Sequence, residues 1–106
     1  MTIDVLIIDD EVETCRMLAT ALGLFGYAPR TALSGAEALE IAAGQPPDVV
    51  VLDVMMPGMD GFEVAQRMRS STTLQHVPII VVTAIGDVNA EEKSMAAGAP
   101  AFLRKP

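Results

Sequence analysis

The chain has 106 residues, of which 51% are hydrophobic, and a formal net charge of −7 at pH 7. This length fits a single domain with its own core, and the hydrophobic content excludes a disordered chain. An excess of acidic residues argues against direct nucleic-acid binding by the domain, and no apolar run is long enough to cross a membrane. We therefore expect one domain over residues 1–106. With no basic signal-peptide start and a single cysteine, Cys15, we expect it to be cytoplasmic.

Short β-branched runs alternate with helical patterns along the chain. We expect strands at about residues 3–9, 28–32, 48–53 and 78–83, and a last short strand that ends at Leu103. We expect helices at about residues 11–25, 34–43, 60–70 and 87–97, of which the last has the weakest pattern. This alternation predicts an α/β fold with a five-stranded parallel sheet, helices on both faces and right-handed crossovers.

Local signals mark the ends of several expected helices. Asp10 with Glu13, and Ser34 with Glu37, have the spacing of a capping box at a helix N-terminus. Gly26 is a natural stop for the first helix. These signals predict helices that begin just after Asp10 and Ser34.

The first helix has more apolar surface than one sheet contact requires. Its apolar residues form two neighbouring stripes, Cys15-Leu18-Leu22-Phe25 and Met17-Ala21-Leu24. A helix that covers one side of a sheet needs an apolar face about 100° wide. We therefore expect a further helix or a partner against the second stripe, and a second copy of the chain, giving a homodimer, is one such partner.

Polar residues close the hydrophobic runs of four expected strands. Asp9 and Asp10 follow the first run, Asp53 follows the third, Thr83 the fourth and Lys105 the last. In parallel sheets the ligand crevice lies at the carboxyl ends of the strands. We therefore expect three carboxylates, a hydroxyl and an ammonium group to converge at one edge.

The three carboxylates point to a cation site. Asp10 alone could be a helix cap, and Asp53 alone a solvated strand end. Two like charges 4 Å apart, however, repel by about 4 kcal/mol at an effective dielectric constant near 20. Carboxylate oxygens with few basic neighbours favour Mg²⁺, which usually keeps several waters.

A metal alone does not account for Lys105 and Thr83. Either could be an ordinary surface or edge residue. A carboxylate that accepts a phosphoryl group, however, becomes an acyl phosphate whose oxygens need positive charge and hydrogen-bond donors. We therefore predict that Asp53 is the phosphate acceptor and that Lys105 and Thr83 stabilise the phosphoryl group. His76 and Cys15 have no expected catalytic role.

Over its whole length the chain resembles the receiver domain of two-component response regulators. The segments that carry the resemblance are Ile7–Glu11, Asp53–Gly61, Val82–Ala84 and Gly98–Pro106. It implies a flavodoxin-like strand order, 2-1-3-4-5, with a fifth helix that is missing here. It also implies that Asp53 accepts its phosphoryl group from a histidine kinase or a phosphotransfer protein.

The resemblance assigns further roles at the metal site. Mg²⁺ would be held by Asp10, Asp53 and the main-chain carbonyl of Met55, with Asp9 acting through water. The domain would catalyse only its own phosphorylation and slow dephosphorylation, without being a metabolic enzyme.

It also implies a switch and an access route. Thr83 and Phe102 would form the switch pair, and the small Ala84 would leave the phosphate accessible. Met55 and Ile85 would flank the approach of a hydrolytic water to the phosphate.

Three other functions fit parts of the pattern. A haloacid-dehalogenase-like phosphatase also uses an Asp nucleophile and Mg²⁺, but it carries an Asp-x-Asp pair on its first strand, unlike Asp9-Asp10-Glu11. A flavodoxin-like cofactor binder needs a Ser/Thr/Gly-rich phosphate loop where this chain is acidic. A degenerate receiver that only binds partners would not need every site residue.

Overall fold

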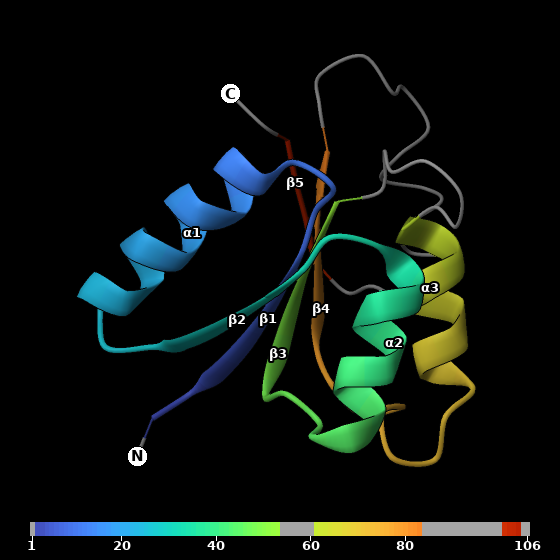
Figure 1. Cartoon of the computed structure of the whole chain (residues 1–106). Helices are drawn as coiled ribbons and strands as arrows, with labels where there is room; N and C mark the ends of the chain where they lie inside the picture. The colour runs from blue at the N-terminus through green and yellow to red at the C-terminus, as the bar shows by residue number, and fades with distance from the viewer. Residues whose placement is uncertain (1, 54–60, 84–100, 105–106) are drawn as a thin grey trace.

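The computed structural model describes residues 2–53, 61–83 and 101–104, with the backbone alone for residue 83 and residues 101–104. Five parallel strands form one sheet in the order β2-β1-β3-β4-β5, as Figure 1 shows. The strands are β1 (Asp4–Ile8), β2 (Ala28–Ala32), β3 (Val49–Asp53), β4 (Ile79–Thr83) and β5 (Ala101–Arg104). The strand order expected from the resemblance is confirmed.

Three helices are described, and they lie on both faces of the sheet. They are α1 (Val12–Leu24), α2 (Gly35–Gly44) and α3 (Gly61–Arg69). In Figure 1, α1 lies on one side of the sheet, and α2 and α3 lie together on the other. The helix expected at residues 87–97 falls outside the described residues.

The strands separate two hydrophobic cores because successive side chains point to opposite faces. On the α2–α3 side, Leu6 and Ile8 of β1 and Val50 and Leu52 of β3 are buried in the larger core. The smaller core lies on the α1 side, and its residues are Val5, Ile7, Cys15, Leu18, Ala19, Leu22, Val49 and Val51. The strands are therefore apolar on both faces, as expected of a buried parallel sheet.

Cap residues explain where two helices begin and end. The Ser34 hydroxyl accepts a hydrogen bond from the Glu37 N–H at 3.1 Å, so the predicted cap of α2 is confirmed. Gly26 follows α1 with a φ of 88°, in the left-handed region that favours glycine. The chain turns there because this conformation cannot continue the helix.

The predicted capping box of α1 is wrong. The N-cap residue is Glu11, and its side chain makes no capping hydrogen bond. The carboxylate that binds here belongs to Asp9, whose Oδ1 accepts from the Glu11 N–H at 2.9 Å. Asp10 is exposed and lies beside Asp9 and Asp53 instead of capping the helix.

The two stripes of α1 are buried to different extents. Cys15 is buried, and Leu18 and Leu22 pack against the smaller core, but Phe25 lies beyond the helix and is 81% exposed. The prediction that Phe25 belongs to the first stripe is therefore wrong. In the second stripe Met17 is 64% and Leu24 is 83% exposed. In the part of the chain that the structure describes, nothing covers this second stripe, and no helix is long and apolar enough to cross a membrane.

Candidate functional site

The side-chain alternation of two central strands directs two carboxylates to the same face of the sheet. Ile7 of β1 and Val51 of β3 both face α1, and they pair in the sheet. Asp9 and Asp53 are each two residues further along, so both continue on the α1 face. The order of strands places β1 next to β3, which brings these two aspartates together.

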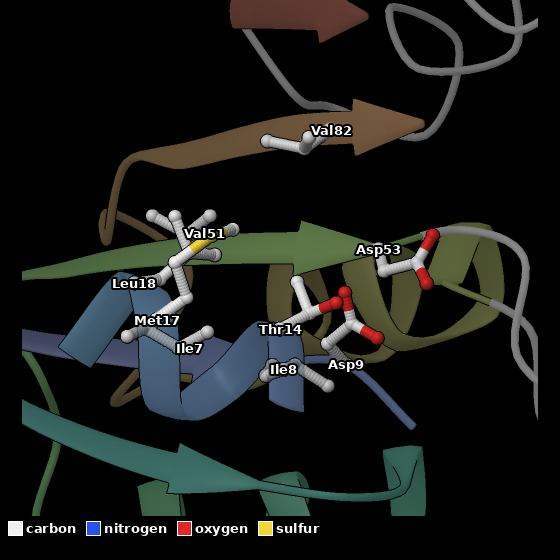
Figure 2. A pocket seen from close by; sticks show the side chains of 9 residues that line it. All are labelled: Ile7, Ile8, Asp9, Thr14, Met17, Leu18, Val51, Asp53 and Val82. Carbon is white, nitrogen blue, oxygen red and sulfur yellow. The ribbon is translucent and has the colours of Figure 1, made fainter. Parts of the chain in front are cut away.

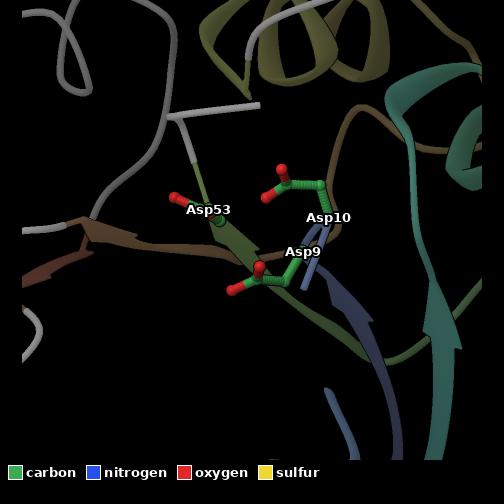
Figure 3. A group of neighbouring side chains, drawn as sticks. All are labelled: Asp9, Asp10 and Asp53. Carbon is green, nitrogen blue, oxygen red and sulfur yellow. The ribbon is translucent and has the colours of Figure 1, made fainter. Parts of the chain in front are cut away.

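Asp10 completes a cluster of three carboxylates. One oxygen from each of Asp9, Asp10 and Asp53 lies within 4.8 Å of the others. Figure 3 shows the three side chains side by side. Asp9 is 2% and Asp53 4% exposed, whereas Asp10 is open to solvent. The predicted convergence of these three residues is confirmed.

The charges of this cluster need compensation. At 4.8 Å two carboxylates repel by about 3.5 kcal/mol at an effective dielectric constant near 20. The N-terminus of α1 lies directly after Asp10, and its positive end offsets part of this repulsion. A hard divalent cation would offset more, and three carboxylate oxygens are ligands of the kind that Mg²⁺ binds.

Asp9 is held in place by hydrogen bonds of its N–H, its carbonyl and its carboxylate. Its N–H donates to the Ala32 carbonyl at 3.1 Å and so extends the pairing of β1 with β2. Its carbonyl accepts from Cys15 Sγ at 3.4 Å, and its Oδ1 accepts from the Glu11 N–H. The position of the Asp9 carboxylate in the cluster is therefore well defined.

An apolar pocket of about 240 Å³ opens beside the two buried carboxylates. Figure 2 shows its lining, which comes from β1, β3, β4 and α1. Asp9, Asp53 and Thr14 are its polar residues, and the apolar ones are Ile7, Ile8, Met17, Leu18, Val51 and Val82. The pocket therefore has one polar end, at the carboxyl ends of the strands.

The other predicted site residues are described in part. Thr83 is the last residue of β4, one position beyond the Val82 that pairs with Asp53, so its backbone lies at the same edge of the sheet. Phe102 of β5 pairs with Val81. Met55, Ala84, Ile85 and Lys105 lie outside the described residues.

Sequence reasoning missed Thr14, which lines the pocket with Asp9 and Asp53. Its hydroxyl is the one uncharged polar side chain among the described lining residues. The available signal was its position, since the third residue of a helix directs its side chain back toward the helix N-terminus.

Comparison with known proteins identifies the family. A model of the family described as response regulator receiver domain matches residues 5–106. The response regulator PleD of Caulobacter vibrioides is 38% identical over 106 residues, which is all of this chain and 23% of PleD. The chain spans less than half the length of the curated relatives it matches.

Solved structures agree in fold. A response regulator from Chloroflexus aurantiacus superposes with a TM-score of 0.95 and 37% identity, covering 100% of this chain and 87% of that chain. The chemotaxis protein CheY4 of Vibrio cholerae gives a TM-score of 0.94 and 33% identity, covering 100% and 88%. The alternative of a haloacid-dehalogenase-like phosphatase is not supported by these similarities.

Proposed function

Because the chain belongs to the response regulator receiver domain family, we propose that it is a switch in which Asp53 accepts a phosphoryl group. The observation that carries the proposal is the cluster of Asp53 with Asp9 and Asp10 at the carboxyl ends of adjacent strands. Asp53 is 4% exposed, and it lines the polar end of the pocket.

Receiver domains generally bind Mg²⁺ at an acidic pocket, and the donors of this chain fit that ion. Three carboxylate oxygens lie within 4.8 Å of one another, and oxygen is the donor that Mg²⁺ prefers. Asp10, Asp53 and the main-chain carbonyl of Met55 would hold the ion, and Asp9 would bind one of its waters. When bound, the ion supplies positive charge that offsets the charges of the carboxylates and of the incoming phosphoryl group.

The chemical step would be a transfer of the phosphoryl group from nitrogen to oxygen. An Asp53 carboxylate oxygen attacks the phosphorus of a phosphohistidine in line with the leaving nitrogen. The new P–O bond forms while the P–N bond breaks, and the histidine nitrogen keeps the electron pair of the broken bond. Lys105 and the Thr83 hydroxyl would bind the phosphoryl oxygens.

The switch would connect the phosphate to the far end of the sheet. Thr83 closes β4 and Phe102 lies on the neighbouring β5. Movement of Thr83 toward the phosphate would leave space for Phe102 to rotate, which shifts the balance between two packings of the same chain. Ala84 would keep the phosphate accessible because its side chain is small.

The partners follow from the family. The phosphoryl donor would be a histidine kinase or a phosphotransfer protein in the cytoplasm. Receiver domains are phosphoacceptor switches rather than turnover enzymes, and this one would only catalyse its own phosphorylation and slow dephosphorylation. A homodimer through the exposed stripe of α1 is a further part of the proposal, supported by the exposure of Met17 and Leu24.

Phosphorylation by a small donor tests the proposal. With Mg²⁺ and acetyl phosphate, the intact mass of the wild-type domain should increase by one phosphoryl group. Asp53→Asn should prevent this gain, and removal of Mg²⁺ with a chelator should do the same. Glu40→Gln, a neutralised carboxylate on the exposed surface of α2, is the matched control and should be phosphorylated normally. Full phosphorylation of the Asp53→Asn variant would contradict the proposal.

A further inference from the structure

Thr14 is the one uncharged polar residue among the described residues that line the pocket beside the carboxylates. It is the third residue of α1, it is half-buried, and it lines the pocket with Asp9 and Asp53. Its neighbours on the helix side of the pocket are Met17 and Leu18, which are apolar. A hydroxyl in these surroundings needs a hydrogen-bond partner, because a buried hydroxyl without one destabilises the folded protein.

The hydroxyl is directed toward the carboxylates. Helical side chains tilt toward the N-terminus of their helix, and α1 begins at Val12, beside the ends of the strands. In Figure 2 the Thr14 oxygen lies on the Asp9 side of the pocket, away from Met17 and Leu18. Thr14 therefore extends the acidic site by one neutral group.

No described residue is hydrogen-bonded to this hydroxyl. Threonine in a helix commonly donates to the carbonyl four residues earlier. Across residues 2–53, 61–83 and 101–104, no hydrogen bond to the Thr14 side chain is found. Since Thr14 is only half-buried, its hydroxyl is within reach of solvent.

A water bound to a cation needs hydrogen-bond acceptors for its hydrogens. Such a water gives a lone pair to the cation and is left with two hydrogens to donate. A carboxylate accepts one of them, as Asp9 can. The second hydrogen needs another acceptor, and a threonine hydroxyl oxygen has two lone pairs. Thr14 offers such an oxygen, and apart from Asp9 and Asp53 the other described lining residues are apolar.

We propose that Thr14 is a positioning residue of the metal site, whose hydroxyl holds, together with Asp9, a water that binds the cation. The proposal rests on the proposed function, because it requires a divalent cation at the acidic cluster. It adds a residue on α1 to a site otherwise built from the ends of the strands. Partners in the outer shell of a metal typically change its affinity when they are removed.

Two substitutions separate the hydroxyl from the packing of the side chain. Thr14→Val keeps the branched shape and removes the hydroxyl, whereas Thr14→Ser keeps the hydroxyl and removes a methyl group. Isothermal titration with Mg²⁺ measures the dissociation constant, and water relaxation with Mn²⁺ reports the waters on the bound ion. Thr14→Val should weaken Mg²⁺ binding roughly five- to tenfold, and Thr14→Ser should stay within about twofold of wild type.

The results distinguish this proposal from the proposed function. If wild type binds Mg²⁺ and is phosphorylated while Thr14→Val binds Mg²⁺ equally well, only the role of Thr14 is wrong. If Thr14→Ser binds as weakly as Thr14→Val, packing accounts for the effect and the proposal is also overturned. If wild type binds no Mg²⁺, the metal site itself fails, and both proposals fail with it. Should Thr14→Val not fold, Thr14→Ala must show the same weakening.

Discussion

Asp9 and Asp10 are neighbours in sequence but have different environments. Asp9 is 2% exposed and fixed by hydrogen bonds of its N–H, its carbonyl and its carboxylate, whereas Asp10 is exposed. Alternation along the strand explains the difference, because Asp9 still follows the pleat of β1 and Asp10 does not. This difference would suit a metal site in which the buried Asp9 binds a water of the ion and the exposed Asp10 binds the ion directly.

The lifetime of the phosphate should depend on Met55 and Ile85. Both side chains are apolar, so neither can orient a hydrolytic water by hydrogen bonding, and we expect slow autodephosphorylation. The double variant Met55→Asn with Ile85→Glu should lose its phosphate several-fold faster, because both new side chains can bind water. Decay of the phosphorylated mass after removal of the donor measures the rate. An equal or slower rate in the double variant would rule out this explanation.

At the scale of single residues, sequence reasoning located charges better than hydrogen bonds. The convergence of Asp9, Asp10 and Asp53 was predictable because each lies at or just beyond the carboxyl end of a strand of a parallel sheet. The hydrogen bond before α1 was not, because Asp9 and Asp10 both have suitable side chains and only the path of the chain determines that Asp9 accepts from the Glu11 N–H. Thr14 was missed because a single threonine within a helix carries no distinctive pattern.

Among the elements, α2 depends most visibly on the residue that caps its N-terminus. Ser34 accepts a hydrogen bond from the Glu37 N–H, and Ala38 and Ala42 of the helix are fully packed in the larger core. Ser34→Ala should therefore destabilise the domain by about 1 kcal/mol, measured by urea denaturation. Ser70→Ala is the matched control, because the Ser70 hydroxyl only bonds the Gln66 carbonyl and should change stability by less than about 0.5 kcal/mol. Equal effects of the two substitutions would remove the special role of the cap.

The strands β4 and β5 are expected to carry the switch. They pair over Ile80–Thr83 and Ala101–Arg104, so under the proposed function a change at Thr83 would reach Phe102 through directly adjacent strands. Beryllofluoride, which mimics a bound phosphoryl group, should change amide hydrogen exchange mainly within residues 83–103. Exchange in β1 and β2 serves as the internal reference and should stay the same. Unchanged protection throughout residues 83–103 would contradict the switch.

In the molecule as a whole, the two faces of the sheet are covered unequally. On the α2–α3 face Ile79 and Val81 of β4 are fully buried. On the other face, Ile80 and Val82 of the same strand are only half-buried, and α1 is the one described helix on that side. The second apolar stripe of α1 is exposed as well, so the described part of this face has apolar side chains open to solvent.

This surface should make the domain self-associate at high concentration. The net charge of −7 opposes association, so the association should strengthen as salt screens the charge. In sedimentation velocity, the average mass of wild type should rise with concentration, and Met17→Glu with Leu24→Glu should keep the domain monomeric. Gln66→Glu with Gln75→Glu, which adds the same two negative charges at exposed positions outside α1, is the control for charge alone. A wild type that stays monomeric at every concentration and salt would show that this surface does not associate.

The overall fold was largely predictable, whereas the extent of its burial was not. Alternating β-branched runs and helical stripes predicted the sheet, and every described strand lies within about one residue of its expected range. The exposure of Phe25 was not predictable from the stripe, because the helix ends at Leu24 and the turn at Gly26 moves the next side chain off the helix face.

The most direct test of the central claim is the identity of the modified residue. The domain is phosphorylated with acetyl phosphate and Mg²⁺, and the acyl phosphate is then reduced with borohydride, which converts a phosphorylated aspartate into homoserine. Tandem mass spectrometry of the digested protein should find homoserine at position 53 and nowhere else. Homoserine at Asp9 or Asp10, or a phosphoryl group on a serine, a threonine or His76, would contradict the assignment of Asp53 as the phosphate acceptor.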